Sequence, residues 1–303
     1  MSVQAEPRDL ASWLALARRL EAGGHHALLV GDHPGDGASP WSALGAAAAV
    51  TTRLRLGTYV LQAGVREPMH MAADAATLDM LAPGRVLLGL GAGHTPQEWR
   101  DIGLLRPSPG ERAGRLVESV DAVARLLRGE SVSIAGEHVS LSGSRLTGLP
   151  VGAGRVALVV GGGHPDVLRA AAARADVVGL SGLGRTLADG HRHEVRWSER
   201  RLEAQLRTVR DEAGRVGTSP AVEVLVQRVI ATDDRAGAIE ELRARLPDTP
   251  AQELAATPFL LIGTPEEMAA QLRRQADRYG ITRYVVREPA IDHLEPALAL
   301  LAR

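Results

Sequence analysis

The chain of 303 residues contains no cysteine, no lysine and no asparagine, so all 35 of its basic residues are arginine. Without cysteine there is no thiolate nucleophile, disulfide, zinc ribbon or iron–sulfur cluster. Without lysine there is no Schiff base and no P-loop lysine, and without asparagine there is no N-glycosylation acceptor. These absences exclude several catalytic and metal-binding classes before any pattern is considered.

The chain also lacks an excess of one charge and a long apolar run. Its 35 basic residues stand against 36 acidic ones, so no overall field attracts nucleic acid or an anionic membrane. Glu6, Arg8 and Asp9 lie where a secretory signal would be apolar, and no run reaches the roughly 20 apolar residues of a membrane helix. We therefore expect a cytoplasmic protein that acts on a small molecule and has no nucleic-acid or membrane partner.

Short runs rich in Val, Leu and Ile alternate with longer segments whose apolar residues recur at helical spacing. The clearest helix start is Thr264-Pro265-Glu266-Glu267, with a capping Thr, a Pro at the first helical position and a Glu three residues after the cap. Gly280 is expected to end that helix. The predicted strands are residues 3–5, 27–30, 54–61, 86–90, 156–160, 177–180, 222–230 and 281–286.

Strands that are apolar on both faces, each followed by a helix, favour a parallel sheet covered by helices. Eight such units average about 38 residues, slightly more than a closed (β/α)₈ barrel of about 250 residues needs. We therefore predict one α/β domain over residues 1–303, a (β/α)₈ TIM barrel with small insertions. The insertions are a hairpin at 131–142 and a Pro-rich interruption at 247–263. An open doubly wound sheet is the alternative, but the even composition favours closure.

The active site of such a barrel lies at the C-terminal ends of its strands. Polar and glycine-rich segments follow three of the predicted strands. They are Gly31-Asp32-His33-Pro34, Gly89-Leu90-Gly91-Ala92-Gly93-His94 and Gly161-Gly162-Gly163-His164-Pro165. We expect all three to meet at one mouth of the barrel.

The triple glycine at residues 161–163 ends a strand and opens a helix, so it exposes backbone N–H groups at the positive end of a helix dipole. This arrangement predicts a phosphate site. Ser181, which follows the next strand, could offer its hydroxyl to the same anion. A plain turn is the alternative interpretation.

The glycines at 89, 91 and 93 have G-x-G-x-G spacing, and no strand ending in an acidic residue follows about 20 residues later, so they do not form a dinucleotide fingerprint. Glycine does let a flat ring system approach the backbone closely. Together with His94, these residues predict one wall of a cofactor pocket.

His33 is the best candidate for proton chemistry, because it follows a strand at the expected mouth and an unperturbed imidazole titrates near pH 6.5. The alternative is that His33 is a structural residue that forms a hydrogen bond. The neighbouring Asp32 is expected to point to the opposite side of the chain, because successive side chains alternate on an extended strand. His191 and His193 form a His-x-His pair without cysteine or a carboxylate at ligand spacing, which favours a solvated loop and no metal site. No G-x-S-x-G hydrolase motif exists.

Taken together, these segments resemble the bacterial luciferase-like monooxygenase superfamily, and within it the branch that depends on the deazaflavin coenzyme F420. The resemblance covers essentially the whole chain. The matching segments include Val30-Gly31-Asp32-His33-Pro34, residues 51–58, Pro83-Gly84-Arg85, Gly89-Leu90-Gly91-Ala92-Gly93, Pro109-Gly110-Glu111-Arg112 and Tyr284-Val285-Val286.

The resemblance implies a (β/α)₈ barrel, a homodimer, and F420 at the C-terminal mouth with its phosphate over the loop of Gly161, Gly162 and Gly163. It also implies a non-proline cis peptide bond between Tyr59 and Val60. His164 departs from close relatives, which continue the glycine run at this position. The implied cofactor-binding residues are Asp32, Thr58, Tyr59, Val60, Gly91, Ala92, Gly93, Gly161, Gly162, Gly163, His164 and Ser181.

The activity implied is hydride transfer between C5 of the deazaflavin and a C=C, C=N or C=O bond of a small organic substrate, with His33 or His94 handling the proton. Trp41 would form an apolar wall for the substrate, unless it is an ordinary packed tryptophan. Arg287 would bind a substrate carboxylate, unless it pairs with Glu288 or Asp292. An FMN-dependent monooxygenase and a flavin-binding protein without turnover are the alternatives.

Overall fold

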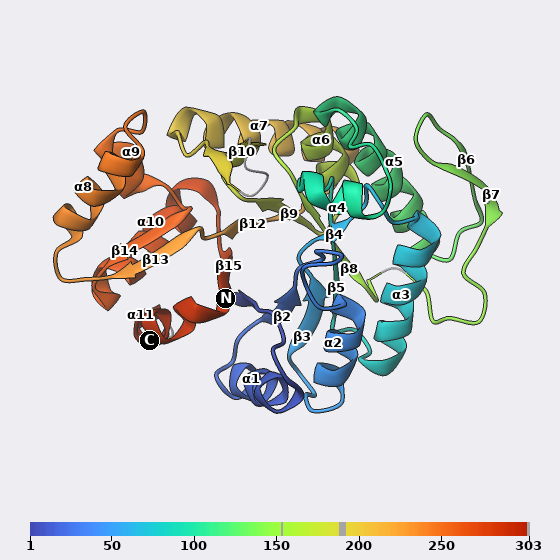
Figure 1. Cartoon of the computed structure of the whole chain (residues 1–303), viewed down its shortest axis with the longest axis horizontal. Helices are drawn as coiled ribbons and strands as arrows, with labels where there is room; N and C mark the ends of the chain where they lie inside the picture. The colour runs from blue at the N-terminus through green and yellow to red at the C-terminus, as the bar shows by residue number, and fades with distance from the viewer. Residues whose placement is uncertain (153, 188–191, 302–303) are drawn as a thin grey trace.

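The computed structural model describes residues 1–152, 154–187 and 192–301. Eight parallel strands close into a barrel, because β3 pairs with β2 on one side and with β5 on the other. The predicted (β/α)₈ barrel is confirmed, and each predicted strand overlaps one strand of this barrel (Figure 1). The barrel strands are β1 (Ser2–Gln4), β2 (Ala27–Val30), β3 (Arg55–Thr58), β5 (Val86–Gly91), β8 (Ala157–Gly161), β9 (Val177–Leu180), β12 (Ala221–Leu225) and β15 (Arg283–Arg287).

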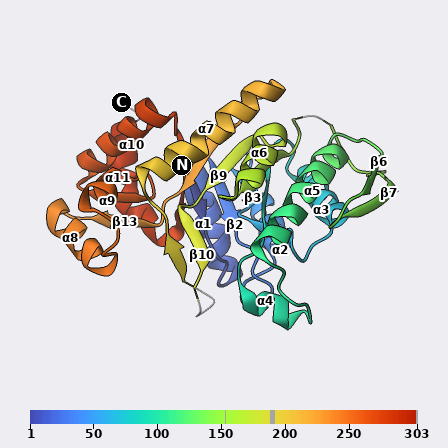
Figure 2. The same cartoon turned by 90° about the horizontal axis from the view of Figure 1, so that it is seen from above.

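Helices surround the barrel on the outside (Figures 1 and 2). The longer ones are α1 (Leu10–Ala22), α2 (Pro40–Ala48), α3 (Pro68–Leu81), α5 (Pro109–Leu127), α6 (Pro165–Arg174), α7 (Glu199–Val216), α8 (Arg235–Arg245), α10 (Pro265–Tyr279) and α11 (Ile291–Leu301). Two short helices are α4 (Pro96–Asp101) and α9 (Ala251–Ala256). The predicted capping box of α10 is present, since Thr264 and Glu267 exchange backbone and side-chain hydrogen bonds, and Gly280 ends the helix in the left-handed conformation.

Two predicted strands are interrupted. Residues 54–61 divide into β3 and the short β4 (Leu61–Gln62), with the cis Tyr59–Val60 peptide bond that the resemblance implied between them. The prediction of one strand over 222–230 was wrong. After β12 the backbone N–H of Gln227 donates to Phe259 O, and β13 (Arg228–Ala231) leaves the barrel to pair with β14 (Leu260–Gly263). A run of apolar residues does not show where its hydrogen-bond partner changes.

Three excursions extend the barrel. The predicted hairpin is formed by β6 (Val132–Ala135) and β7 (Ser140–Ser144), at the right of Figure 1. The Pro-rich interruption contains α9 and β14, which lie with α8 at the left of the same view. A hairpin that the sequence did not reveal follows β9 and consists of β10 (Leu183–Thr186) and β11 (His193–Val195). Within the described ranges, no helix combines the length and the apolarity needed to cross a membrane.

Candidate active site

The C-terminal ends of the barrel strands open into one cavity of about 1360 Å³. The three glycine-rich and polar segments that the sequence placed at one mouth do meet there. The predicted site residues that line the cavity are Asp32, His33, Tyr59, Val60, Gly91, Ala92, Gly93, His94, Gly161, Gly162, Gly163, His164, Ser181 and Arg287.

Two predicted site residues, Thr58 and Trp41, are not among the described residues that line this cavity. The Thr58 side chain is fully buried between β3 and β5, where its hydroxyl donates to Gly89 O and accepts from Gly89 N. Trp41 lies in the first turn of α2 and packs against the core outside the barrel. The strand-to-strand contact and the position of α2 explain why neither side chain reaches the mouth.

His33 is held by a carboxylate that comes from a different element, the short helix α4. The Nδ1–H of His33 donates to Oε1 of Glu98 at 2.7 Å, and the Glu98 residue is only 5% exposed. With its amide nitrogen turned toward Glu98, Gln62 donates to Oε2 at 3.0 Å. The hydrogen bond to Glu98, together with the charges of Glu98 and Glu6, raises the pKa of His33 above 6.5 against the opposing effect of burial. Glu98 therefore stabilises the protonated form of the His33 imidazole relative to an isolated one.

His94 has the opposite electrostatic environment although it lies beside His33, with ring centroids 5.9 Å apart. Burial, together with the charges of His193 and His33, lowers the pKa of His94 to about 4. His94 is therefore neutral near pH 7. Its ring also lies 4.6 Å from the ring of His193, which comes from β11 and lines the cavity. The prediction of a solvated loop was thus wrong for His193, while His191 lies outside the described residues.

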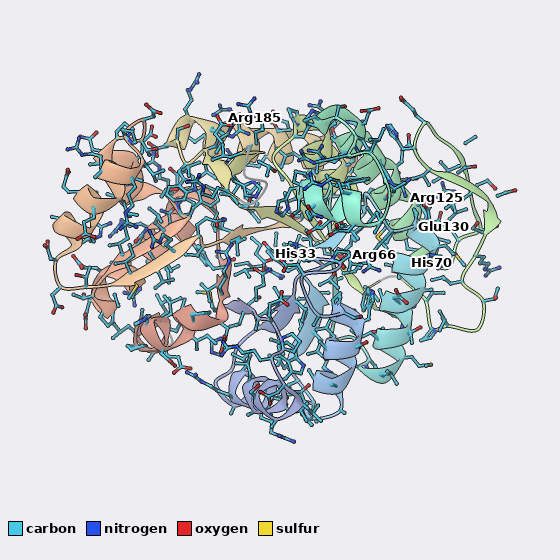
Figure 3. All side chains as sticks on the ribbon, viewed as in Figure 1. His33, Arg66, His70, Arg125, Glu130 and Arg185 are labelled. Carbon is cyan, nitrogen blue, oxygen red and sulfur yellow. The ribbon has the colours of Figure 1, made fainter. Side chains whose placement is uncertain are left out.

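Asp32 points away from His33, as an extended backbone requires, and is engaged within the protein. Its two carboxylate oxygens accept hydrogen bonds of 2.6 and 2.7 Å from Arg66, the side chain labelled in Figure 3. One of these oxygens also accepts from Gln62 N at 3.0 Å. On the other side of the same segment, Gln4 Nε2 donates to Tyr59 O at 3.0 Å. These contacts fix the backbone around the Tyr59–Val60 peptide bond at the bottom of the cavity.

The glycines of β5 make room for this segment of the chain itself. A Cβ atom on Gly89 would lie 2.2 Å from Thr58 O, and one on Gly91 would lie 2.4 Å from Val60 Cγ2. Gly89 and Gly91 therefore lack side chains because the Thr58–Val60 segment packs directly against β5 at these positions. Val60 then lies above Gly91 and forms part of the cavity wall.

The triple glycine leads into the N-terminus of α6, where His164 is the capping residue and accepts a hydrogen bond from Asp166 N. Helices α5 and α7 both pack against α6. Arg112 in the first turn of α5 and Arg201 in the first turn of α7 line the cavity. Helix N-termini and guanidinium groups both attract anions, so this side of the cavity is suited to a phosphate.

Three arginines on this side of the cavity have no acidic partner among the described residues. Among the described residues, neither Arg106, Arg112 nor Arg201 forms an ion pair, and the buried Nε atoms of Arg106 and Arg112 lack any hydrogen-bond acceptor. Burial and the charge of Arg106 lower the pKa of Arg112 to about 10. Buried donors without acceptors are costly, so an anionic ligand would satisfy groups that the fold leaves unpaired. The residues present fit a phosphate-bearing cofactor.

Comparison with known proteins gives the family. Residues 1–283 match the family model described as luciferase-like monooxygenase. The chain belongs to the luciferase-like monooxygenase family. This luciferase-like chain also superposes on the coenzyme F420-dependent tetrahydromethanopterin reductase of Methanopyrus kandleri with a TM-score of 0.75, over 100% of this chain and 97% of that one. At 18% identity, this similarity shows the fold alone.

Two curated relatives of this luciferase-like chain are named F420-dependent glucose-6-phosphate dehydrogenase. The protein of Nakamurella multipartita is 30% identical over 311 residues, covering 95% of this chain and 89% of the relative. The protein of Beutenbergia cavernae is 37% identical over 195 residues, covering 61% of this chain. That second alignment spans only 56% of the relative's length.

Three residues of the site were not predicted from the sequence: Glu98, which pairs with His33, and Arg112 and Arg201, which lie beside the glycine loop. Glu98 follows His94 by four residues and is the carboxylate nearest to that segment in the sequence, but its pairing with His33 depends on the path of α4. Arg112 and Arg201 each lie in the first turn of a predicted helix, where a cation is unexpected because the dipole favours acids there. That mismatch was the available signal for an anion site.

Proposed function

We propose that this protein is an F420-dependent oxidoreductase that transfers a hydride between the cofactor and a C=C, C=N or C=O bond of a small organic substrate. The observation that carries the proposal is a single cavity that joins the glycine loop and its unpaired arginines to the His33–Glu98 pair. The F420-dependent names of the two curated relatives support the choice of cofactor.

Bound in its reduced form, F420 supplies a hydride from C5. When the substrate accepts that hydride on one atom of its double bond, the other atom must take up a proton. Protonated His33 is the group suited to deliver it, because Glu98 holds the Nδ1–H and leaves the Nε2–H as the proton to give. In the oxidative direction the same nitrogen accepts the proton. Neutral His94 is then available to orient the substrate by hydrogen bonding.

The cavity also has to position the reactants and exclude water. Val60 and Gly91 provide a wall against which a flat ring can lie, and the β10–β11 hairpin covers part of the mouth, with Thr186 Oγ1 donating to His94 O. Holding the ring within about 3–3.5 Å of the substrate carbon is what such walls contribute to the rate. By covering part of the mouth, the hairpin limits the access of water to the reacting atoms.

FMN carries a ribityl phosphate like that of F420, so the phosphate site does not by itself select between them. The test is a titration of the purified protein with each cofactor, followed by absorbance, and then a screen of unsaturated substrates with the loaded protein. Tight binding of F420 with turnover is expected. Preferential binding of FMN with oxygen consumption would replace the proposal by a monooxygenase, and binding without any turnover would indicate a flavin-binding protein.

We further propose that the protein is a homodimer in the cytoplasm, on the basis of the resemblance described above. Sedimentation equilibrium of the purified protein measures its mass directly. A mass of one chain at micromolar concentration would contradict the dimer.

A further inference from the structure

Arg287 is an arginine of the cavity that neither the fold nor the phosphate site accounts for. Arg287 ends β15 and lines the cavity. Around the barrel, β15 lies two strands from β2, which leads to His33, and three strands from β8, which leads to the glycine loop. The end of β15 is thus one strand nearer to the strand of the proton donor than to the strand of the glycine loop.

The acidic residues that follow Arg287 in the sequence pair with other arginines. Glu288 Oε2 accepts from Arg8 at 3.0 Å, and Asp292 Oδ1 accepts from Arg19 at 2.5 Å. Among the residues that the structure describes, Arg287 has no ion pair. The surface ion pair that the sequence offered as the alternative for Arg287 is therefore wrong.

The contacts of Arg287 orient its guanidinium without neutralising it. Its Nη atoms donate to the backbone and side-chain oxygens of Gln227 at 3.3 to 3.5 Å, longer than the usual 2.9–3.0 Å. Gln227 is itself fixed, because its Nε2 donates to Ser181 O at 2.8 Å. Partial burial lowers the pKa of Arg287, and none of the described carboxylates pairs with it. Arg287 is exposed toward the cavity, so its guanidinium has donors left for a planar anion that enters from outside.

We propose that Arg287, oriented by Gln227, binds the carboxylate of the substrate, so that the substrate class is small organic acids with a reducible double bond. The proposal rests on the proposed function for the chemistry, but the binding step can be tested alone. A guanidinium and a carboxylate match in geometry and charge, and their paired hydrogen bonds are about twice as strong as neutral ones.

The test measures binding of four probes to the F420-loaded protein by calorimetry: crotonate and benzoate, with crotonamide and benzamide as their neutral isosteres. The wild type should bind at least one acid about tenfold or more tightly than its amide. Arg287→Gln should abolish this preference, Arg287→Lys should restore part of it, and F420 affinity should stay unchanged in both. Arg18→Gln, an exposed arginine of α1 outside the cavity, is the charge-matched control and should keep the full preference.

Equal affinity for acid and amide in the wild type, including no binding of either, would overturn the proposal. So would an acid preference that survives Arg287→Gln. A protein that binds no F420 would contradict the proposed function instead, and the same titration on the unloaded protein would still decide the role of Arg287.

Discussion

Strand β2 has a histidine near each end, and the two have opposite properties. His26 precedes the strand at the closed end of the barrel, where burial and the charge of Arg55 lower its pKa to about 4 and its buried Nε2 has no hydrogen-bond partner. His33 follows the strand at the open mouth, where Glu98 raises its pKa. The difference lies in the carboxylate that α4 brings from 65 positions away in the sequence. A histidine thus acquires proton chemistry from its partner, and its place beside an apolar strand is not sufficient.

The largest expected effect comes from removing the histidine at the mouth. His33→Ala should lower the rate of hydride transfer by about 10²–10⁴-fold, because the general acid is lost, while F420 affinity stays unchanged. His26→Gln, at the other end of the same strand, should leave the rate unchanged. Stopped-flow absorbance of F420 measures both. If the two variants have the same rate, the comparison between the two ends fails.

The next largest effect is expected for Arg201, one of the arginines without an ion pair at the open mouth of the barrel. Arg201→Gln should weaken F420 binding about tenfold, the value expected for the loss of a charged hydrogen bond to an anion. Arg210→Gln on the exposed side of the same helix is the matched control and should bind F420 as the wild type does. Fluorescence titration gives both constants. Equal weakening by the two substitutions would indicate a general charge effect and contradict a specific phosphate site.

A smaller, pH-dependent effect should follow from removing the partner of His33. With Glu98→Gln the pKa of His33 falls, since the first cause of its rise is the hydrogen bond to Glu98. The wild type loses the acid form as pH rises through the raised pKa, so in the variant this alkaline loss of activity moves to lower pH. The pH dependence of kcat, with an NMR titration of the His33 ring, measures the shift. An unchanged alkaline limb would show that Glu98 does not tune His33.

The smallest effect on the activity is expected at the closed end, where a buried carboxyl group affects the stability of the fold. Burial raises the pKa of Glu223, on β12, to about 7, against 4.5 for an unperturbed group. The folded state therefore binds this proton more tightly than the unfolded state, and stability falls as pH rises from about 4.5 through 7. Glu223→Gln should gain roughly 2–3 kcal/mol relative to the wild type at pH 8 compared with pH 5, because a pKa raised from 4.5 to about 7 corresponds to about 1.4 kcal/mol per unit. Urea unfolding at the two pH values checks this, and a pH-independent difference would contradict it.

The barrel could be predicted from the sequence because each strand buries both faces and its apolar run is visible locally. Ala27–Val30 and Val177–Leu180 match the predicted bounds. The break at Gln227 could not be predicted, since it depends on Phe259 supplying the next hydrogen-bond acceptor from a distant segment. A local run of apolar residues identifies a strand, but the point at which the strand changes its hydrogen-bonding neighbour depends on the folded chain.

The same limit applies to the site. His33, the triple glycine and Arg287 each lie at the C-terminal end of a predicted barrel strand, and they do line one cavity. This much could be predicted, because it follows from the barrel fold alone. The sequence could not show which of the two neighbouring histidines has a raised pKa, or which arginines lack an ion pair. His33 and His94 differ through Glu98 and His193, and Arg287 is unpaired because Arg8 and Arg19 take the nearby carboxylates.

The most direct test of the account is a crystal structure of the protein loaded with F420. The account predicts the phosphate against Gly161, Gly162 and Gly163 within hydrogen-bonding distance of Arg112 or Arg201, and the deazaflavin ring against Val60 with its C5 edge toward His33. A phosphate outside this loop, or a ring turned away from His33, would contradict it.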